Sequence, residues 1–242
     1  MSKKRKVLVG TPCYDGRADV WYVNSLFQTG KMAHELNVEI IPIWLSYDAL
    51  IQRARNDCLA LALEMNCDDI IFIDSDLEWQ PEWFFKLLDY PVDVVGGTYR
   101  KKTDDNEVYV AKFDNLHAIQ PDRQTGLMEM EGLGTGFLRM SRNAMQWLWD
   151  NSAPYNETEE GKHRRWIFEV IVENGSLISE DILLCRKLRL NGYKIWLDPA
   201  MTLSHIGTKK YQGDFQNWFA QAQMMVNNTQ LTTNNKFRDL YK

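Results

Sequence analysis

The chain has 242 residues, of which 45% are hydrophobic and 25% are charged, and its 28 basic and 33 acidic residues give a formal net charge of −5. This composition is typical of one ordinary globular domain and excludes a disordered or fibrous chain. No apolar run approaches the about 18 residues that span a membrane, and the acidic balance argues against binding of nucleic acid.

The start of the chain and its cysteines indicate the compartment. Basic residues at 3–6 precede an apolar run too short for a signal peptide, so we expect a cytoplasmic protein that is not secreted. The four cysteines form no CxxC pair, and we expect reduced thiols and no cysteine metal site. Cys58 and Cys185 lie in apolar helical patterns, which predicts small buried side chains.

Strands and helices alternate along the first hundred residues. Runs of apolar and β-branched residues predict strands over 6–10, 38–44, 70–73 and 92–97. The helical spacing of apolar residues predicts helices over 19–36, 46–65 and 81–88. Ser46 is the expected N-cap of the second helix, and Pro81 occupies the first turn of the third. This alternation predicts an α/β fold with a parallel sheet and helices on both faces.

The pattern is looser after residue 100. We expect short strands and loops over 100–131, the clearest strand being 108–111, and a mobile loop over 151–165. Further strands are expected over 133–140, 194–197 and 202–204, and further helices after a cap at Ser141, from Ser179 to Leu190, and over 215–226.

We find no repeat and no low-complexity linker, which indicates one domain over 1–227. Its first part, 1–100, carries the regular alternation of strands and helices, and 101–227 is an elaborated second half. The polar segment 228–242 is an expected disordered tail.

Two carboxylates follow the most apolar predicted strand, in the sequence Asp74-Ser75-Asp76. Open α/β sheets bind ligands at the carboxyl ends of their strands, and carboxylates there suit Mg²⁺ or Mn²⁺, which in turn hold phosphate oxygens. A solvated turn is the alternative, because Asp and Ser favour turns in any case.

Two more segments are expected near that edge. Arg53, Asn56 and Asp57 lie within about one turn of a predicted helix, where a guanidinium can pair with a carboxylate or a phosphate; an ordinary exposed helix face is the alternative. The segment Gly10-Thr11-Pro12-Cys13-Tyr14-Asp15 follows the first strand. Since the chain contains neither a GxGxxG nor a Walker motif, a dinucleotide-binding or P-loop protein is disfavoured.

The second half adds glycines and a histidine. Gly132, Gly134 and Gly136 recur at every second position, which allows either close approach of a ligand to the backbone or a tight bend. His205 ends a short predicted strand and is either structural or a ligand.

Acidic residues follow Ser179 at the start of a predicted helix. Glu180 and Asp181 either complement the helix dipole or supply a base that takes a proton from a hydroxyl. Trp79, just past Asp76, is the first candidate for packing against a sugar, with packing in the core as the alternative.

The order of these motifs resembles that of nucleotide-sugar glycosyltransferases with the GT-A fold, most closely family 2-like enzymes and the compact members found in phages and viruses. The resemblance covers about Val7 to Asp214. It implies a Rossmann-like, mostly parallel central sheet flanked by helices, with a nucleotide-binding half over 1–100 and an elaborated C-terminal half over 101–227 that completes the acceptor and metal sites. The matching motifs are Gly-Thr-Pro at 10–12, Ala-Arg-Asn at 54–56, Asp74-Ser75-Asp76, Gly-Thr-Gly-Phe at 134–137, Glu180-Asp181 and His205.

The resemblance also implies a role for each matching position. The nucleoside pocket would be lined by Thr11, Pro12, Tyr14 and Asp15. The rest of the donor site would comprise Arg53, Arg55, Asn56, Ser75, Gly134, Thr135 and Gly136, with Lys209 and Lys210 closing over the diphosphate. Mn²⁺ or Mg²⁺ would be held by Asp76 and His205, with Asp74 as a further ligand or facing the sugar. Asp181 would be the general base, with Glu180 beside it.

The implied reaction moves a sugar from a nucleoside diphosphate of the UDP or GDP type to a hydroxyl, most simply that of a glycan. Inverting members commonly carry Gln-x-x-Arg-Trp near the end, whereas this chain has Gln212-Gly213-Asp214-Phe215-Gln216-Asn217-Trp218, so inversion is favoured and retention stays open. A nucleotidyltransferase and an inactive sugar-nucleotide-binding module stay open as well. Oligomeric state has no signal in the sequence.

Overall fold

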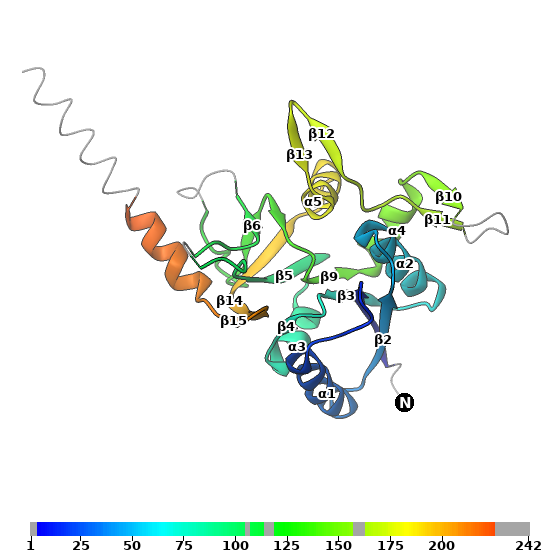
Figure 1. The fold of residues 1–242 in the computed structure, drawn as a ribbon, viewed down its shortest axis with the longest axis horizontal. Helices are drawn as coiled ribbons and strands as arrows, with labels where there is room; N and C mark the ends of the chain where they lie inside the picture. Colours follow the sequence, from blue (N-terminus) through cyan, green and yellow to red (C-terminus); the bar gives the residue numbers. More distant parts are fainter. Residues whose placement is uncertain (1–3, 105–106, 114–118, 157–162, 226–242) are drawn as a thin grey trace, which may run out of the picture.

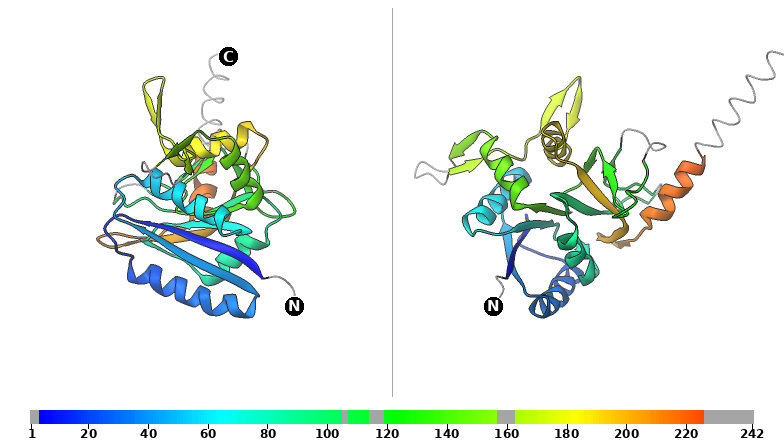
Figure 2. Two further views of the ribbon diagram at one scale, coloured as in Figure 1. Left: turned by 90° about the vertical axis from the view of Figure 1, so that its right-hand side faces the viewer. Right: turned by 180° about the vertical axis from the view of Figure 1, so that it is seen from behind.

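The structure is a computed structural model that describes residues 4–104, 107–113, 119–156 and 163–225. A central sheet lies between two layers of helices (Figures 1 and 2). In the left view of Figure 2, α1 (Val20–Glu35, blue) lies on one side of the sheet and α2 (Ile51–Glu64, light blue) on the other. The predicted α/β class is confirmed.

Most strands of the central sheet run in one direction. The parallel set comprises β1 (Arg5–Cys13), β2 (Val38–Ser46), β3 (Asp69–Ile73), β5 (Val94–Tyr99) and β14 (Ile195–Ile206). The order across the sheet is β15-β14-β5-β9-β3-β1-β2. In it, β9 (Phe137–Ser141) runs antiparallel between β3 and β5, and β15 (Lys210–Tyr211) pairs antiparallel with β14. The carboxyl ends of the parallel strands therefore meet at one edge of the sheet.

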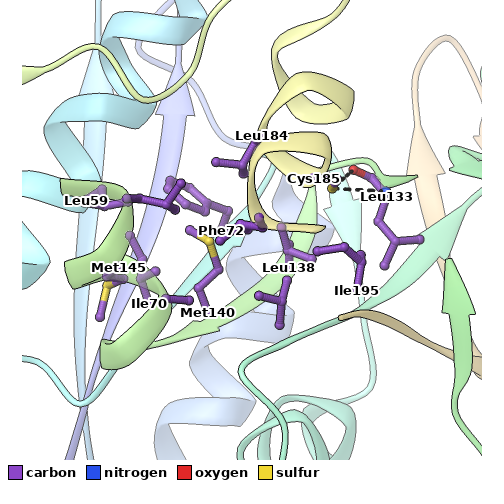
Figure 3. Packing of buried hydrophobic residues seen from close by; sticks show 14 of the residues in the cluster. Leu59, Ile70, Phe72, Leu133, Leu138, Met140, Met145, Leu184, Cys185 and Ile195 are labelled. Carbon is purple, nitrogen blue, oxygen red and sulfur yellow. Dashed lines mark hydrogen bonds between the residues drawn. The ribbon is translucent and has the colours of Figure 1, made fainter. Parts of the chain in front are cut away.

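The apolar run of β3 is buried on both faces. Ile70 and Phe72 belong to a cluster with α2, α4 (Arg142–Asp150) and α5 (Glu180–Leu190), as Figure 3 shows. Ile71 and Ile73 belong to a second cluster with α1 and α3 (Pro81–Asp89). Helices on both sides explain why β3 is a continuous apolar run and not an alternating one.

Short strands complete the second half of the chain. Two of them, β4 (Leu77–Glu78) and β7 (Met128–Met130), pair antiparallel with β14. Three two-stranded sheets are formed by β6 (Ala111–Lys112) with β8 (Gly132–Leu133), β10 (Pro154–Asn156) with β11 (His163–Arg165), and β12 (Ile171–Glu173) with β13 (Ser176–Ile178). A helix covers 215–225, the described part of the one predicted over 215–226.

The interpretation of 151–165 as an unpatterned loop is wrong for its described residues, because β10 and β11 pair there. The buried side chain of Arg164 joins this pair to α2 through Asp57 (2.6 Å) and Glu64 (3.0 Å). Residues 157–162 lie outside the described residues. The polar composition of the segment gave no indication that Arg164 is buried, because its partners lie about a hundred residues earlier in the sequence.

The predicted N-cap of α2 is also wrong. Ser46 ends β2, Tyr47 has a positive φ of 64°, and the helix begins only at Ile51. The Asp48 carboxylate accepts the Leu50 backbone N–H at 2.9 Å just before the helix starts. The strand extends further than expected because its pairing with β1 continues to Ser46.

The two short strands predicted over 194–197 and 202–204 are parts of the single strand β14, whose pairing with β5 shifts register between Leu197 and Thr202. The predicted tail 228–242 lies outside the described residues, and the division into 1–100 and 101–227 stays a prediction. Within the described ranges, no helix is long and apolar enough to cross a membrane.

Candidate active site at the carboxyl edge of the sheet

The carboxyl ends of β1, β3 and β14 and the start of α2 surround a cavity of about 350 Å³, here named the edge cavity. Several residues expected to act together line it although they lie far apart in the sequence. The lining comprises Pro12, Tyr14, Asp15, Asp48, Ala49, Ile51, Asp74, Ser75, Asp76 and His205.

Strand pairing brings Asp76 and His205 together. β4 pairs antiparallel with β14, and the Ile206 backbone N–H donates to the Asp76 carbonyl at 2.8 Å. His205 Nε2 then lies 3.5 Å from Asp76 Oδ1. His205 Nδ1 donates to the Arg100 carbonyl at 2.9 Å, which leaves Nε2 as the ring nitrogen that faces the carboxylate.

Asp76 also has a lysine as a neighbour. Lys102 Nζ donates to Asp76 Oδ2. Burial raises the pKa of the Asp76 carboxyl, but the hydrogen bonds and charges of His205 and Lys102 outweigh burial and lower that pKa overall. Asp76 is thus held ionised, as a metal ligand must be.

Asp76 and His205 suit a divalent cation whose remaining coordination positions are filled by a bound substrate and water. Among the described residues, no group of three or more His, Cys, Asp or Glu side chains converges to hold a metal ion. Mg²⁺ and Mn²⁺ commonly take one or two carboxylates and fill the other positions with substrate phosphate oxygens and water. A carboxylate beside an imidazole nitrogen, with the other ring nitrogen bonded to a carbonyl, fits such a site, and an imidazole ligand favours Mn²⁺ over Mg²⁺.

Arg55 joins three elements behind the cavity. Its side chain is only 4% exposed, and it donates to Glu180 Oε1 at 2.6 Å and to Asp74 Oδ1 at 3.2 Å. Burial lowers the pKa of Arg55, but the charges of Asp74 and Glu180 outweigh burial and raise it. The Asp74 oxygen at Arg55 is therefore already engaged by a guanidinium.

Asp181 is fixed in the first turn of α5. Its Oδ1 accepts the Ser179 hydroxyl and also the Ile182 backbone N–H, the latter at 2.7 Å. Its charge raises the pKa values of both Arg55 and Tyr99, which places Asp181 close to the residues behind the cavity. It does not belong to the lining of the edge cavity itself.

The glycine-rich segment packs around Tyr99. A Cβ at Gly136 would lie 2.6 Å from Asp74 Oδ2, and one at Gly134 would lie 3.0 Å from the Tyr99 hydroxyl. Burial, with the charge of Asp74, raises the pKa of Tyr99, whose hydroxyl donates to Asp74 at 3.4 Å. These glycines make room for Tyr99, and Thr135 between them is buried.

Thr11, Asn56 and Arg53 are among the predicted donor-site residues that lie outside the cavity lining. Thr11 is fully buried, with its hydroxyl 2.6 Å from that of Tyr22. Asn56 is also fully buried, and its Oδ1 accepts the backbone N–H groups of residues 167 and 168 at 3.1 and 3.0 Å. Arg53 makes two hydrogen bonds of 2.7 Å to Asp48, which itself lines the cavity.

The two predicted lysines pair with acidic side chains. Lys209 pairs with Asp104. Lys210 donates to Glu78 at 2.7 Å and lies 3.7 Å from the centre of the Trp21 ring. Neither lysine lines the edge cavity.

Sequence reasoning missed the segment 99–102, which supplies Tyr99, the carbonyl that orients His205, and Lys102. The basic residues at 100–102 could have indicated this segment. They follow the predicted strand 92–97, which ends at the same edge of the sheet as the candidate site. The prediction that Trp79 offers a face to sugar is wrong: the ring is 3% exposed and packs against Tyr22, and its Nε1 donates to Thr29 at 3.1 Å.

Comparison with known proteins adds to this geometry. No protein-family model matches the chain, and no curated protein matches it. Among solved structures, the chain is similar to A197 from STIV, with a TM-score of 0.54, 16% identity, and coverage of 84% of this chain and 86% of that one. At this identity the likeness shows a shared fold.

Two other structures match less well. One is a glycosyltransferase involved in the glycosylation of the major capsid of PBCV-1, with a TM-score of 0.34, 10% identity, and coverage of 59% of this chain and 62% of that one. The other is S. aureus TarS 1-349, with a TM-score of 0.42, 14% identity, and coverage of 80% and 57%. At these scores neither carries an argument, so the proposed function depends on the residues of the site.

Proposed function

We propose that the protein is a metal-dependent glycosyltransferase that moves a sugar from a nucleoside diphosphate of the UDP or GDP type to a hydroxyl of a glycan. One observation carries the proposal: Asp76 Oδ1 and His205 Nε2 face each other at 3.5 Å beside a cavity of about 350 Å³ at the carboxyl edge of the sheet. Open α/β sheets bind nucleotides at this edge.

Different parts of the edge cavity would bind the nucleoside and the diphosphate of the donor. Tyr14 and Pro12 line one part and supply an aromatic and an apolar surface for the nucleoside. Asp76 and His205 line another part and would hold Mn²⁺ or Mg²⁺, which stabilises the negative charge that develops on the leaving diphosphate. Lys102, 2.5 Å from Asp76, lies where an ammonium can add to that stabilisation.

Asp181 would act as the base. In the transfer, the acceptor oxygen bonds to the sugar carbon as the bond from that carbon to the diphosphate oxygen breaks, and the hydroxyl proton passes to the Asp181 carboxylate. General-base assistance of this kind raises the rate of the transfer by about 10²–10⁴-fold. The hydrogen bonds from Ser179 and Ile182 orient this carboxylate, and the pairing of Glu180 with Arg55 fixes the start of α5.

A thermal-shift panel tests the donor site. UDP-, GDP-, CDP- and TDP-sugars are compared with the free nucleotides, each with and without Mn²⁺. A ligand at 100 times its dissociation constant stabilises the fold by about 2.7 kcal/mol. We expect one nucleotide sugar to stabilise the protein only with metal, and Asp76→Asn to abolish the shift. Asp89→Asn, an exposed acidic position on α3, is the matched control and should respond like the wild type.

Different results would indicate a different activity. Stabilisation by nucleoside triphosphates alone would indicate a nucleotidyltransferase. Binding of a sugar nucleotide without turnover on any glycan would indicate a binding module, and a product with the donor's anomeric configuration would indicate a retaining enzyme. No shift with any ligand would refute the donor site.

A further inference from the structure

A second cavity is lined by residues of the β4–β14 pair and of α1. Its volume is about 340 Å³, and we name it the amide cavity after four of its lining residues, Asn24, Gln28, Gln80 and Gln212. Ser204 lines the amide cavity, whereas His205, the next residue of the same strand, lines the edge cavity.

The four amide side chains are available to a ligand. Each belongs to an exposed residue, and none makes a side-chain hydrogen bond with another described residue. Each primary amide offers two donors and one acceptor oxygen in a plane. By contrast, Glu78, on the same lining, is paired with Lys210 at 2.7 Å.

The wall of the cavity on α1 is rigid. Asn24 and Gln28 lie four residues apart and so share one face of the helix. Ser25, on the same side, donates to the Trp79 carbonyl at 2.9 Å and accepts the Trp79 backbone N–H at 3.2 Å. These bonds tie α1 to the segment that carries Gln80, which sets the spacing of the amides before any ligand binds.

Besides the buried Trp79, one indole ring lines the cavity and another lies under Lys210, the partner of Glu78. Trp83, in the first turn of α3, lines the cavity and is half-buried. Trp21 precedes Asn24 by three residues on α1, is 44% exposed, and lies beneath the ammonium of Lys210 at 3.7 Å. An indole offers a flat apolar face that packs well against the C–H groups of a ring.

The charge of the amide-cavity lining favours an uncharged ligand over an anionic one. Among the described residues that line the amide cavity, Glu78 is the only charged one, and Lys210 neutralises it. A phosphate or sulfate would find no uncompensated cation there. Free amides beside an indole face suit adjacent hydroxyl groups on an uncharged pyranose ring.

From these observations we infer that the amide cavity is a binding site for a neutral carbohydrate, separate from the edge cavity. If the proposed function holds, such a site would bind part of a glycan acceptor or product at a distance from the edge cavity, where the sugar is transferred. The carbohydrate site itself does not depend on that function, because it shares no lining residue with the edge cavity.

The test measures glycan binding directly. Saturation-transfer NMR followed by calorimetry uses maltohexaose, cellohexaose, chitohexaose and an α-mannohexaose as probes, with UDP and a sulfated hexasaccharide as charged comparators. Asn24→Ala with Gln28→Ala removes two amides from exposed helix positions where alanine is well tolerated. Lys31→Ala with Glu35→Ala, two exposed positions on the same helix, is the matched control.

We expect at least one neutral hexasaccharide to bind the wild type, and the Asn24/Gln28 variant to weaken that binding by about tenfold or more, roughly 1.4 kcal/mol. The Lys31/Glu35 variant and Asp76→Asn should bind the same sugar as the wild type does. The inference is overturned if no neutral hexasaccharide binds, if the Asn24/Gln28 variant binds normally, or if Asp76→Asn alone abolishes binding. Failure of the donor site would appear separately, in the nucleotide-sugar panel.

Discussion

At the scale of single residues, burial sets the reactivity of the thiols. All four cysteines are free and buried, and burial raises the pKa values of Cys58 and Cys185 to about 12. In Figure 3, Cys185 lies against Leu133, whose backbone N–H donates to its sulfur at 3.5 Å. A thiol in this setting acts as a small apolar group.

We therefore expect native protein at pH 8 to react with iodoacetamide at neither Cys58 nor Cys185, since the thiolate is the nucleophile and little of it exists at that pH. Peptide mass spectrometry after a timed reaction gives the answer. The same reaction in urea should modify both cysteines. Rapid native labelling of either residue would contradict the burial described here.

Asp48 makes a pH-dependent contribution to the stability of the fold. Burial raises its pKa, but the Arg53 guanidinium and the Leu50 backbone N–H outweigh burial and lower it. A lowered folded pKa stabilises the fold above the unfolded value of about 3.9, and this stabilisation is lost as pH falls through the folded value.

Asp48→Asn should thus lower the free energy of unfolding at pH 7 by at most about 1 kcal/mol, a small effect because Arg53 is 43% exposed. The difference from the wild type should shrink as pH falls below the unfolded value of about 3.9 and disappear once Asp48 is protonated in the folded protein. Urea unfolding at several pH values measures it. A difference of constant size across the series would show that the charge of Asp48 is not its cause.

At the scale of elements, a buried ion cluster holds three strands together at the edge of the sheet opposite the candidate site. Asp69, at the start of β3 and fully buried, accepts Arg5 Nε from β1 and Arg139 Nε from β9, both at 2.6 Å. Burial lowers the pKa of Arg139 although Asp69 opposes this effect. Removing one member leaves buried charge without a partner.

Asp69→Ala should therefore lower the free energy of unfolding by roughly 3–5 kcal/mol. Urea unfolding followed by circular dichroism measures the loss, with Asp89→Ala as the exposed control, for which we expect a change within about 0.5 kcal/mol. A loss below about 1 kcal/mol for Asp69→Ala would mean that the cluster is solvated or rearranged.

At the scale of the whole molecule, Arg55 connects the two halves of the chain. It lies on α2, and its partners Asp74 and Glu180 follow β3 and open α5. Asn56, the next residue, reaches the backbone at 167 and 168. The position of the predicted base Asp181 relative to the edge cavity thus depends on contacts from α2.

Arg55→Met should lower the free energy of unfolding by about 2 kcal/mol or more, because Asp74 and Glu180 would lose a shared counter-ion while partly buried. We also expect it to abolish metal-dependent donor stabilisation. Arg189→Met, at an exposed position in the last turn of α5, is the control and should retain donor stabilisation. Normal donor binding by Arg55→Met would refute its positioning role.

Much of the fold is predictable from local patterns. The apolar run at 70–73, the proline at the start of α3 and the helical spacing over 180–190 each correspond to an observed element. Errors occurred where long-range pairing overrode local signals: Ser46 continues β2 because its partner strand does, and β10 pairs with β11 in a segment expected to be a loop.

The sequence by itself determined the α/β class and which chemical groups follow each strand, because strand ends and helix starts are encoded within a few residues. Only the tertiary structure decided which groups meet. Asp76 faces His205, far along the chain, because β4 pairs with β14, and Lys102 joins them because β5 lies beside β14. The amide cavity likewise needs α1, α3 and β14 at once. Such contacts depend on the packing of elements distant in the chain, which no local pattern specifies.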